Sequence, residues 1–183
     1  MAHAALVDHL LAHAVRRGDF VLKSGRRSDW FIDSKATTCR PDGMLLVAEA
    51  ALDVIPPDAT AIGGLTMGAD AAAFSIAAIG ATRGRMLRAF SVRKEEKDHG
   101  AGGRIAGALE PGDRVVITED TVSRGVSMIE AGRVARDAGA EVVLLLPVVD
   151  RGGTVTELAA AEGWPVRALV TAPDLGFAFE GGA

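Results

Sequence analysis

The order of apolar and polar residues predicts where helices and strands form. Near the N-terminus, Leu6, Leu10, Leu11 and Val15 stand at helical spacing. They predict a helix over residues 4–16, which Gly18 ends.

The next part of the chain is expected to be extended and then helical. Short extended segments are predicted at 20–22 and 30–33, with a turn over 23–26 between them. Pro41 can begin a second helix, which runs to about Val54 before two prolines stop it. This part has only short or isolated elements and shows no regular succession of strand and helix.

From residue 60 onwards, strands and helices alternate. The expected strands are at 60–63, 86–92, 114–118, 141–149 and 166–170, and the expected helices are at 69–78, 127–138 and 154–161. Such alternation predicts parallel strands, right-handed crossovers and helices on both faces of the sheet. We therefore expect a single α/β domain over residues 1–183. In such a sheet, ligands bind at the carboxyl ends of the strands, in the loops that lead into helices.

The composition excludes several classes of protein. Of the 183 residues, 49% are hydrophobic and 24% are charged, which argues against disorder. The formal net charge of −4 gives no sign of the basic surface that a nucleic-acid-binding protein needs. No segment approaches the ~20 apolar residues of a membrane helix, and the N-terminus does not resemble a signal peptide. A cytoplasmic protein without nucleic-acid or membrane partners is therefore expected.

Metal or disulfide chemistry based on cysteine and histidine has little support. Cys39 is the only cysteine, so an intrachain disulfide and a zinc site with several cysteines are excluded. His9 and His13 are four residues apart on the first helix and could share a metal, but no third ligand is suggested. Histidines that face solvent are the simpler interpretation.

Two adjacent carboxylates, Glu119 and Asp120, follow the expected strand 114–118. The next residues, up to Ser127, bring hydroxyl groups, a glycine and the start of a helix. A helix N-terminus offers free N–H groups and a partial positive charge to a phosphate, and carboxylates can accept hydrogen bonds from sugar hydroxyls. The loop therefore matches the chemistry of a ribose 5-phosphate. An ordinary capped helix with a solvated turn is the alternative.

A charged, glycine-rich segment, 93–104, follows the expected strand 86–92. Between Lys94 and Arg104 its only apolar side chain is Ala101, so it cannot dock through an apolar face. Its glycines make it conformationally loose, and we expect it to stay mobile until an anion orders its cations. The alternative is an ordinary solvated loop.

The segment 117–125 resembles the phosphoribosyl-pyrophosphate signature of type I phosphoribosyltransferases: an apolar strand, two acids and a Thr/Gly-rich loop. The resemblance implies a central, mostly parallel sheet flanked by helices, a small N-terminal hood over about residues 1–40 and a flexible catalytic loop. Two residues depart from the usual pattern. Ser123 replaces a threonine, and Arg124 replaces a small residue or a threonine.

Other segments resemble orotate phosphoribosyltransferases in particular. The pattern Arg-Lys-Glu-x-Lys-x-His-Gly in 93–100 is similar to their catalytic loop, and 20–31 is similar to their N-terminal substrate segment. The loop 63–70 resembles the version in actinobacterial members. Arg151 corresponds to the family's arginine for the orotate carboxylate, and a guanidinium at a strand end suits a planar carboxylate. Taken alone, Arg151 would be interpreted as a surface residue that closes a strand.

The resemblance also implies a role for each matching residue. Residues implied to bind phosphoribosyl pyrophosphate are Lys23, Arg93, Lys94, Lys97, His99, Glu119, Asp120, Thr121, Val122, Ser123, Arg124, Gly125, Val126 and Ser127. Those implied to bind orotate are Trp30, Phe31, Ser123 and Arg151. Catalysis is implied for Lys94, Lys97, His99 and Asp120. Trp30 stands where tyrosine or phenylalanine is usual, and core packing is the alternative interpretation of Trp30 and Phe31.

The reaction implied is the transfer of ribose 5-phosphate to orotate, which gives orotidine 5′-monophosphate and pyrophosphate in the synthesis of UMP. The implied cofactor is Mg²⁺, held through phosphoribosyl pyrophosphate and water. The implied assembly is a homodimer in which the segment 93–104 serves the neighbouring active site. Two alternatives stay open: a transferase for a purine base, and a regulator that binds phosphoribosyl pyrophosphate without catalysis.

Overall fold

A mostly parallel sheet forms the centre of the molecule. The computed structural model describes residues 3–21, 25, 27–96 and 103–181. Within this part of the chain, six strands form a sheet in the order β5-β4-β3-β6-β7-β8, and β5 alone is antiparallel to its neighbour. The strands are β3 (Ala61–Leu65), β4 (Arg88–Val92), β5 (Ile105–Gly107), β6 (Arg114–Val122), β7 (Glu141–Asp150) and β8 (Val170–Thr171).

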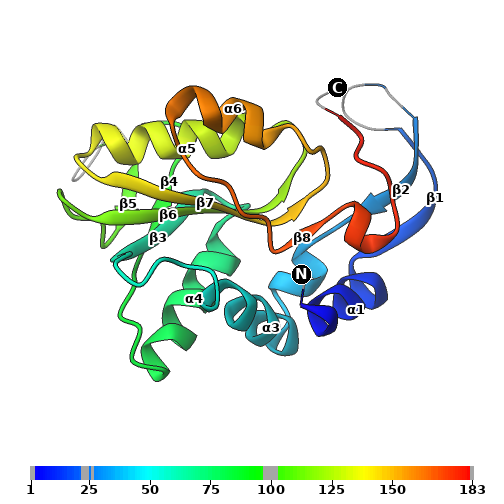
Figure 1. The fold of residues 1–183 in the computed structure, drawn as a ribbon, viewed down its shortest axis with the longest axis horizontal. Helices are drawn as coiled ribbons and strands as arrows, with labels where there is room; N and C mark the ends of the chain where they lie inside the picture. The colour runs from blue at the N-terminus through cyan, green and yellow to red at the C-terminus, as the bar shows by residue number, and fades with distance from the viewer. Residues whose placement is uncertain (1–2, 22–24, 26, 97–102, 182–183) are drawn as a thin grey trace.

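Helices cover both faces of this sheet, as Figure 1 shows, with α3 and α4 on one face and α5 and α6 on the other. Their bounds are α3 (Pro41–Leu52), α4 (Asp70–Thr82), α5 (Val126–Asp137) and α6 (Val155–Glu162). Each face has its own buried apolar cluster, and β7 contributes Leu144 and Leu146 to one and Val142 and Leu145 to the other. The apolar run that predicted a buried strand therefore serves both cores. Leu144, Leu145 and Leu146 alternate across the strand, and a bulge after Val142 places this residue on the same side as Leu145. None of the helices in the described part of the chain is long and apolar enough to cross a membrane.

β6 is longer than the sequence pattern indicates. A strand was expected over 114–118, but β6 pairs with β7 as far as Val122. Thr118 is fully buried, and its hydroxyl donates a hydrogen bond of 2.8 Å to a carbonyl group of β7. Pairing with β7 thus keeps polar residues in the strand, and the acidic pair lies on the strand instead of after it.

β5 has no counterpart among the expected strands. It pairs with β4, with Phe90 opposite Gly107 and Val92 opposite Ile105, so the chain returns beside β4 after the charged segment. Three residues are too few to show an alternating pattern. The expected strand 166–170 is also shorter, because only β8 and a single bridge at Val166 pair with β7.

The N-terminal residues form α1 (Ala4–His13) and a separate antiparallel sheet of β1 (Val15–Val21) and β2 (Arg27–Ile32). The prediction of a helix through residue 16 is wrong, because Val15 pairs with Ile32 in this sheet. Ala14 is buried, and its carbonyl group accepts a hydrogen bond of 3.0 Å from the N–H of Asp33. A short helix, α2 (Lys35–Thr38), then leads to α3.

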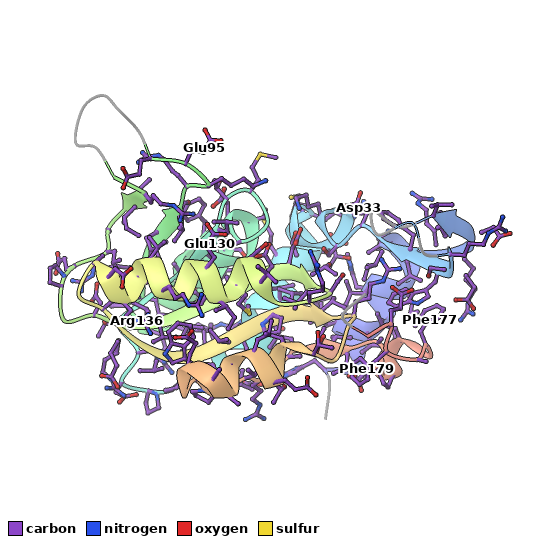
Figure 2. All side chains as sticks on the ribbon, turned by 90° about the horizontal axis from the view of Figure 1, so that it is seen from above. Asp33, Glu95, Glu130, Arg136, Phe177 and Phe179 are labelled. Atoms are coloured by element: carbon purple, nitrogen blue, oxygen red, sulfur yellow. The ribbon has the colours of Figure 1, made fainter. Side chains whose placement is uncertain are left out.

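After β8, the chain forms a 3₁₀ turn, η1 (Pro173–Leu175), and a tail that runs beside β2 (Figure 1). Figure 2 shows Phe177 and Phe179 of this tail at the end of the molecule that carries the N-terminal sheet. Phe177 stacks on Trp30 of β2, with ring centroids 4.3 Å apart and planes 3° from parallel. The C-terminal tail and the N-terminal sheet are therefore packed together.

Candidate active site

The carboxyl ends of β6 and β7 bring together the groups that the sequence predicted for one ligand. Val122 is opposite Asp150 in the sheet, and the N–H of Arg151 donates to the carbonyl oxygen of Val122 (2.8 Å). Beside it, the Thr154 hydroxyl donates to the carbonyl oxygen of Ser123 (3.2 Å). The acidic pair, the loop after it and the arginine therefore lie on two neighbouring strand ends.

The loop between β6 and α5 encloses a small polar cavity. Its volume is about 240 Å³, and it is lined by Glu119 and residues 121–128. Gly125 precedes the helix with φ 88°, a left-handed conformation that glycine adopts without steric cost. The first turn of α5 contains no acidic residue, so the free N–H groups there can receive an anion without repulsion.

The predicted phosphate-binding residues differ in what they offer to a ligand. Ser123, Arg124 and Ser127 are exposed, so two hydroxyl groups and a guanidinium are accessible. Val126 is 55% exposed, whereas Val122 is 3% exposed and its side chain belongs to the core. Val122 can therefore contribute only its backbone.

Glu119 and Asp120 have different surroundings. Asp120 is 7% exposed, forms an ion pair with Lys35 and accepts a hydrogen bond of 2.7 Å from the N–H of Thr121. Burial, and then the charge of Asp120, raises the pKa of Glu119 to about 8, although Lys35 and Lys94 act in the opposite direction. Glu119 therefore keeps its proton near neutral pH in the free protein.

Lys35 and Ser34 also belong to this site, although the sequence pattern predicted neither of them. Burial lowers the pKa of Lys35, but the hydrogen bond to Asp120 and its charge outweigh this effect and raise the pKa overall. The Ser34 hydroxyl lies 2.6 Å from that of Thr121. A lysine just after the expected strand 30–33 was the available signal, but only the fold shows that it reaches the acidic pair.

The predicted segment 63–70 contains the end of β3 and the loop 66–69, and this loop packs against the acidic pair. Gly68 leaves no room for a side chain, because a Cβ atom there would collide with the carboxylate of Glu119. At the end of the loop, Asp70 accepts a hydrogen bond of 2.7 Å from the hydroxyl of Thr66 and another of 2.7 Å from a serine of β4. The shape of this loop therefore helps to determine where Glu119 lies.

The predicted catalytic loop is anchored at its base. The backbone N–H of Arg93 donates a hydrogen bond to the carbonyl oxygen of Arg104 (2.7 Å). The guanidinium of Arg93 donates to the carbonyl oxygen of Gly103 (3.2 Å). Arg104 forms an ion pair with Glu130 of α5, which Figure 2 labels. In this structure Arg93 thus closes the base of the loop.

The remaining cations predicted for this loop are only partly placed. Lys94 is exposed, and its charge lowers the pKa of Glu119. Lys97, His99 and Lys23 of the N-terminal segment lie outside the described residues. Their predicted contacts stay predictions.

Arg151 is buried, with 6% of its surface exposed. Its guanidinium lies over the ring of Trp30, 4.6 Å from the centroid, and its Nη2 donates to the carbonyl oxygen of Trp30 (2.9 Å). Its Nε lies 2.7 Å from Oε2 of Glu180. The arginine predicted for the substrate carboxylate is thus paired with a carboxylate of the C-terminal tail.

Trp30 and Phe31 do not form one aromatic surface. Trp30 is 2% exposed and packs between Phe177 and Arg151. Phe31 points to the other side of β2, is 38% exposed, and lies 5.6 Å from the ring of Phe20. Core packing therefore describes the Trp30 ring in this structure.

The histidine pair near the N-terminus does have an acidic neighbour. The potential ligand atoms of His9, His13 and Asp42 all lie within 4.8 Å of one another. The His9 side chain is only 9% exposed, and its Nδ1 lies 3.1 Å from the hydroxyl of Thr37. The expectation of a solvent-facing His9 is therefore wrong, because α3 packs against this side of α1.

The sheet, the polar cavity at the start of α5 and the acidic pair before it define a type I phosphoribosyltransferase. The solved adenine phosphoribosyltransferase from Rhodothermus marinus supports the fold, with a TM-score of 0.63 over 92% of this chain and 99% of that chain at 20% identity. No family model matches the sequence.

Individual relatives identify the family within this class. The orotate phosphoribosyltransferase of Corynebacterium glutamicum is 39% identical over 176 residues, which are 96% of this chain and 94% of the relative. That of Rhodopirellula baltica is 34% identical over 94% of this chain and 93% of the relative. A solved orotate phosphoribosyltransferase from Mycobacterium tuberculosis matches with a TM-score of 0.81 at 35% identity, over 94% of this chain and 97% of that one.

The chain belongs to the orotate phosphoribosyltransferase family. It is a pentosyltransferase of pyrimidine biosynthesis, as the sequence predicted. Family membership decides against the interpretations as a purine-base transferase or as a regulator.

Proposed function

We propose that this chain catalyses the Mg²⁺-dependent transfer of ribose 5-phosphate from phosphoribosyl pyrophosphate to orotate at the carboxyl ends of β6 and β7. One observation carries the proposal: the cavity at the start of α5, the acidic pair and Arg151 lie on adjacent strand ends. These groups match the phosphate, the ribose and the orotate carboxylate of the product.

In this proposal the N–H groups and hydroxyls of 121–127 bind the 5-phosphate, and Glu119 and Asp120 bind the ribose hydroxyls. Oε2 of Glu119 is buried and makes no hydrogen bond to any of the described residues. Buried polar atoms are rarely left without a partner, so a ribose hydroxyl at this point would complete the site.

The acidic pair also fits the proposed Mg²⁺. Carboxylate oxygens and water are the ligands that this ion prefers, and the unpaired Oε2 of Glu119 can accept a hydrogen bond from a metal-bound water. When bound, Mg²⁺ would neutralise part of the charge of the pyrophosphate. Phosphoribosyl pyrophosphate itself is bound in another solved structure of the M. tuberculosis enzyme, which is 32% identical with a TM-score of 0.79.

The residues of the chain then position and stabilise the reacting groups. Arg151 and Ser123 hold orotate so that its ring nitrogen forms a bond to the anomeric carbon while the bond to pyrophosphate breaks. The proton that the ring nitrogen loses passes to the leaving pyrophosphate or to water. Lys94, Lys97 and His99 on the loop, with Arg93 at its base, stabilise the charge of the leaving group. Closure of the loop excludes water, which would otherwise hydrolyse the activated sugar.

The proposal is tested by following the absorbance of orotate in the presence of purified protein and phosphoribosyl pyrophosphate, with and without Mg²⁺. Consumption of orotate that requires the metal is the expected result, with uracil inert because it lacks the carboxylate. Consumption without the metal would remove the Mg²⁺ requirement. No consumption by folded protein that binds phosphoribosyl pyrophosphate would overturn the proposal as a whole.

We also propose a cytoplasmic homodimer in which the segment 93–104 serves the neighbouring active site. The support is the resemblance of this segment to the family's catalytic loop.

A further inference from the structure

The pairing of Arg151 with Glu180 uses one particular edge of the guanidinium. Nε lies 2.7 Å from Oε2 of Glu180 in an ion pair that lacks hydrogen-bond geometry, and Nη2 donates to Oε1 (3.0 Å), so the carboxylate lies along the Nε/Nη2 edge. The two side chains are only 7% and 13% exposed. Ser28 completes the arrangement, because its hydroxyl donates to Oε1 of Glu180 and accepts a bond of 3.3 Å from Nη2.

Glu180 is held in this place by the backbone of the tail. Its N–H donates to the carbonyl oxygen of Arg151 (3.1 Å), and the N–H of Gly181 donates to that of Gly152 (3.1 Å). The tail is anchored before this point by Phe177, which stacks on Trp30. Glu180 is therefore a fixed part of the site and not a freely moving surface carboxylate.

The same contacts leave one nitrogen of Arg151 available. Nη2 is shared between Trp30, Ser28 and Glu180, and Nε faces Glu180. The guanidinium plane is further restricted by the Trp30 ring beneath it. Nη1 makes no hydrogen bond to any residue in the described part of the chain. The guanidinium thus has a fixed orientation, and among the described residues Nη1 is its one nitrogen with neither a hydrogen bond nor an ion-pair partner.

We propose that Glu180 is a positioning residue for the substrate: it fixes Arg151 so that Nη1 is presented to the carboxylate of orotate. This inference rests on the proposed function, in which Arg151 binds that carboxylate. Glu180 also compensates the buried charge of Arg151 when no substrate is bound, since an unpaired buried arginine is strongly unfavourable. An arginine that is already oriented loses less side-chain entropy when it binds.

The inference is tested by steady-state kinetics of Glu180→Ala and Glu180→Gln beside the wild type. We expect Glu180→Ala to raise the KM for orotate by roughly tenfold or more while the KM for phosphoribosyl pyrophosphate changes little. Glu180→Gln should give an intermediate KM, because its amide oxygen can still accept from the guanidinium. Glu157→Ala is the matched control, because it removes the same charge from an exposed position on α6.

The possible outcomes separate this inference from the proposed function. An unchanged KM for orotate in Glu180→Ala would show that Glu180 has no positioning role. A lower KM would show that Glu180 competes with orotate for Arg151, which also overturns the inference. If thermal unfolding shows that Glu180→Ala does not fold, the KM for orotate of Glu180→Gln decides instead: a raised KM supports the inference, and an unchanged or lower KM overturns it. Failure of the wild type to consume orotate would instead contradict the proposed function.

Discussion

Glu119 shows how the fold changes the chemistry of a single side chain. Burial and the neighbouring charge of Asp120 raise its pKa to about 8 from an ordinary value of 4.5. Between these two values the folded chain holds a proton that the unfolded chain has released. The contribution of Glu119 to stability is thus fully present below pH 4.5 and is lost as the pH rises to about 8.

Glu119→Gln should remove this pH dependence. We expect the variant to gain stability relative to the wild type as the pH rises from 4.5 to 8, because glutamine has no proton to lose. Thermal or urea unfolding at several pH values would measure the difference, with Glu157→Gln as an exposed control. A difference between wild type and Glu119→Gln that is independent of pH would contradict the buried, protonated state of Glu119.

Lys97 allows the catalytic loop to be tested at one residue. Removal of one donor that stabilises a transition-state charge typically costs about 2.7–4 kcal/mol of barrier. We therefore expect Lys97→Ala to keep the fold and to lose ~100-fold or more in turnover. A rate close to that of the wild type, measured on folded protein, would remove this loop from the mechanism.

Among the elements, strands with long apolar runs were predictable, and contacts between distant segments were not. β7 and its two-sided burial could be predicted from the apolar run around Leu144. Lys35 could not be assigned to the site from the sequence, because its partner Asp120 is 85 residues away along the chain. Glu180 was missed for the same reason, since its pairing with Arg151 depends on how the tail packs against β2.

The loop 66–69 between β3 and α4 gives a prediction at the scale of an element. Gly68→Ala should displace the carboxylate of Glu119, because the added Cβ would occupy its place. The KM for phosphoribosyl pyrophosphate should then rise by roughly tenfold or more, with a much smaller effect on the KM for orotate. Met67→Ala, at a side chain that is 72% exposed, is the control in the same loop. Wild-type kinetics in Gly68→Ala would show that this loop does not position Glu119.

At the scale of the whole molecule, the class of fold and the location of the candidate site could be predicted from the sequence. Only some of the residues that form this site could be. The alternation of elements predicted a parallel sheet, and the loop of the signature at 117–125 lines the polar cavity where the phosphate is predicted to bind. The residues that could not be predicted are Ser34 and Lys35 at the start of α2 and Glu180 in the C-terminal tail. The positions of these two segments beside the central sheet depend on tertiary packing. Periodicity carries no information about such docking.

The proposed sharing of the loop between subunits predicts complementation. Lys97→Ala and Asp120→Asn should each be nearly inactive, but their mixture after subunit exchange should recover up to about a quarter of the wild-type rate. Half of the randomly formed dimers would be mixed, and each of these would contain one intact site. No recovery, with exchange shown by differently tagged subunits, would mean that the loop serves its own subunit.

The arrangement of the site is tested most directly by a crystal structure of the protein with orotidine 5′-monophosphate. This product carries the phosphate, the ribose and the orotate carboxylate in one molecule, so a single density map locates all three contacts. We predict the phosphate in the cavity formed by 121–127, the ribose hydroxyls at Glu119 and Asp120, and the carboxylate at Nη1 of Arg151. A phosphate bound away from the start of α5, or a carboxylate that does not contact Arg151, would contradict the proposed arrangement.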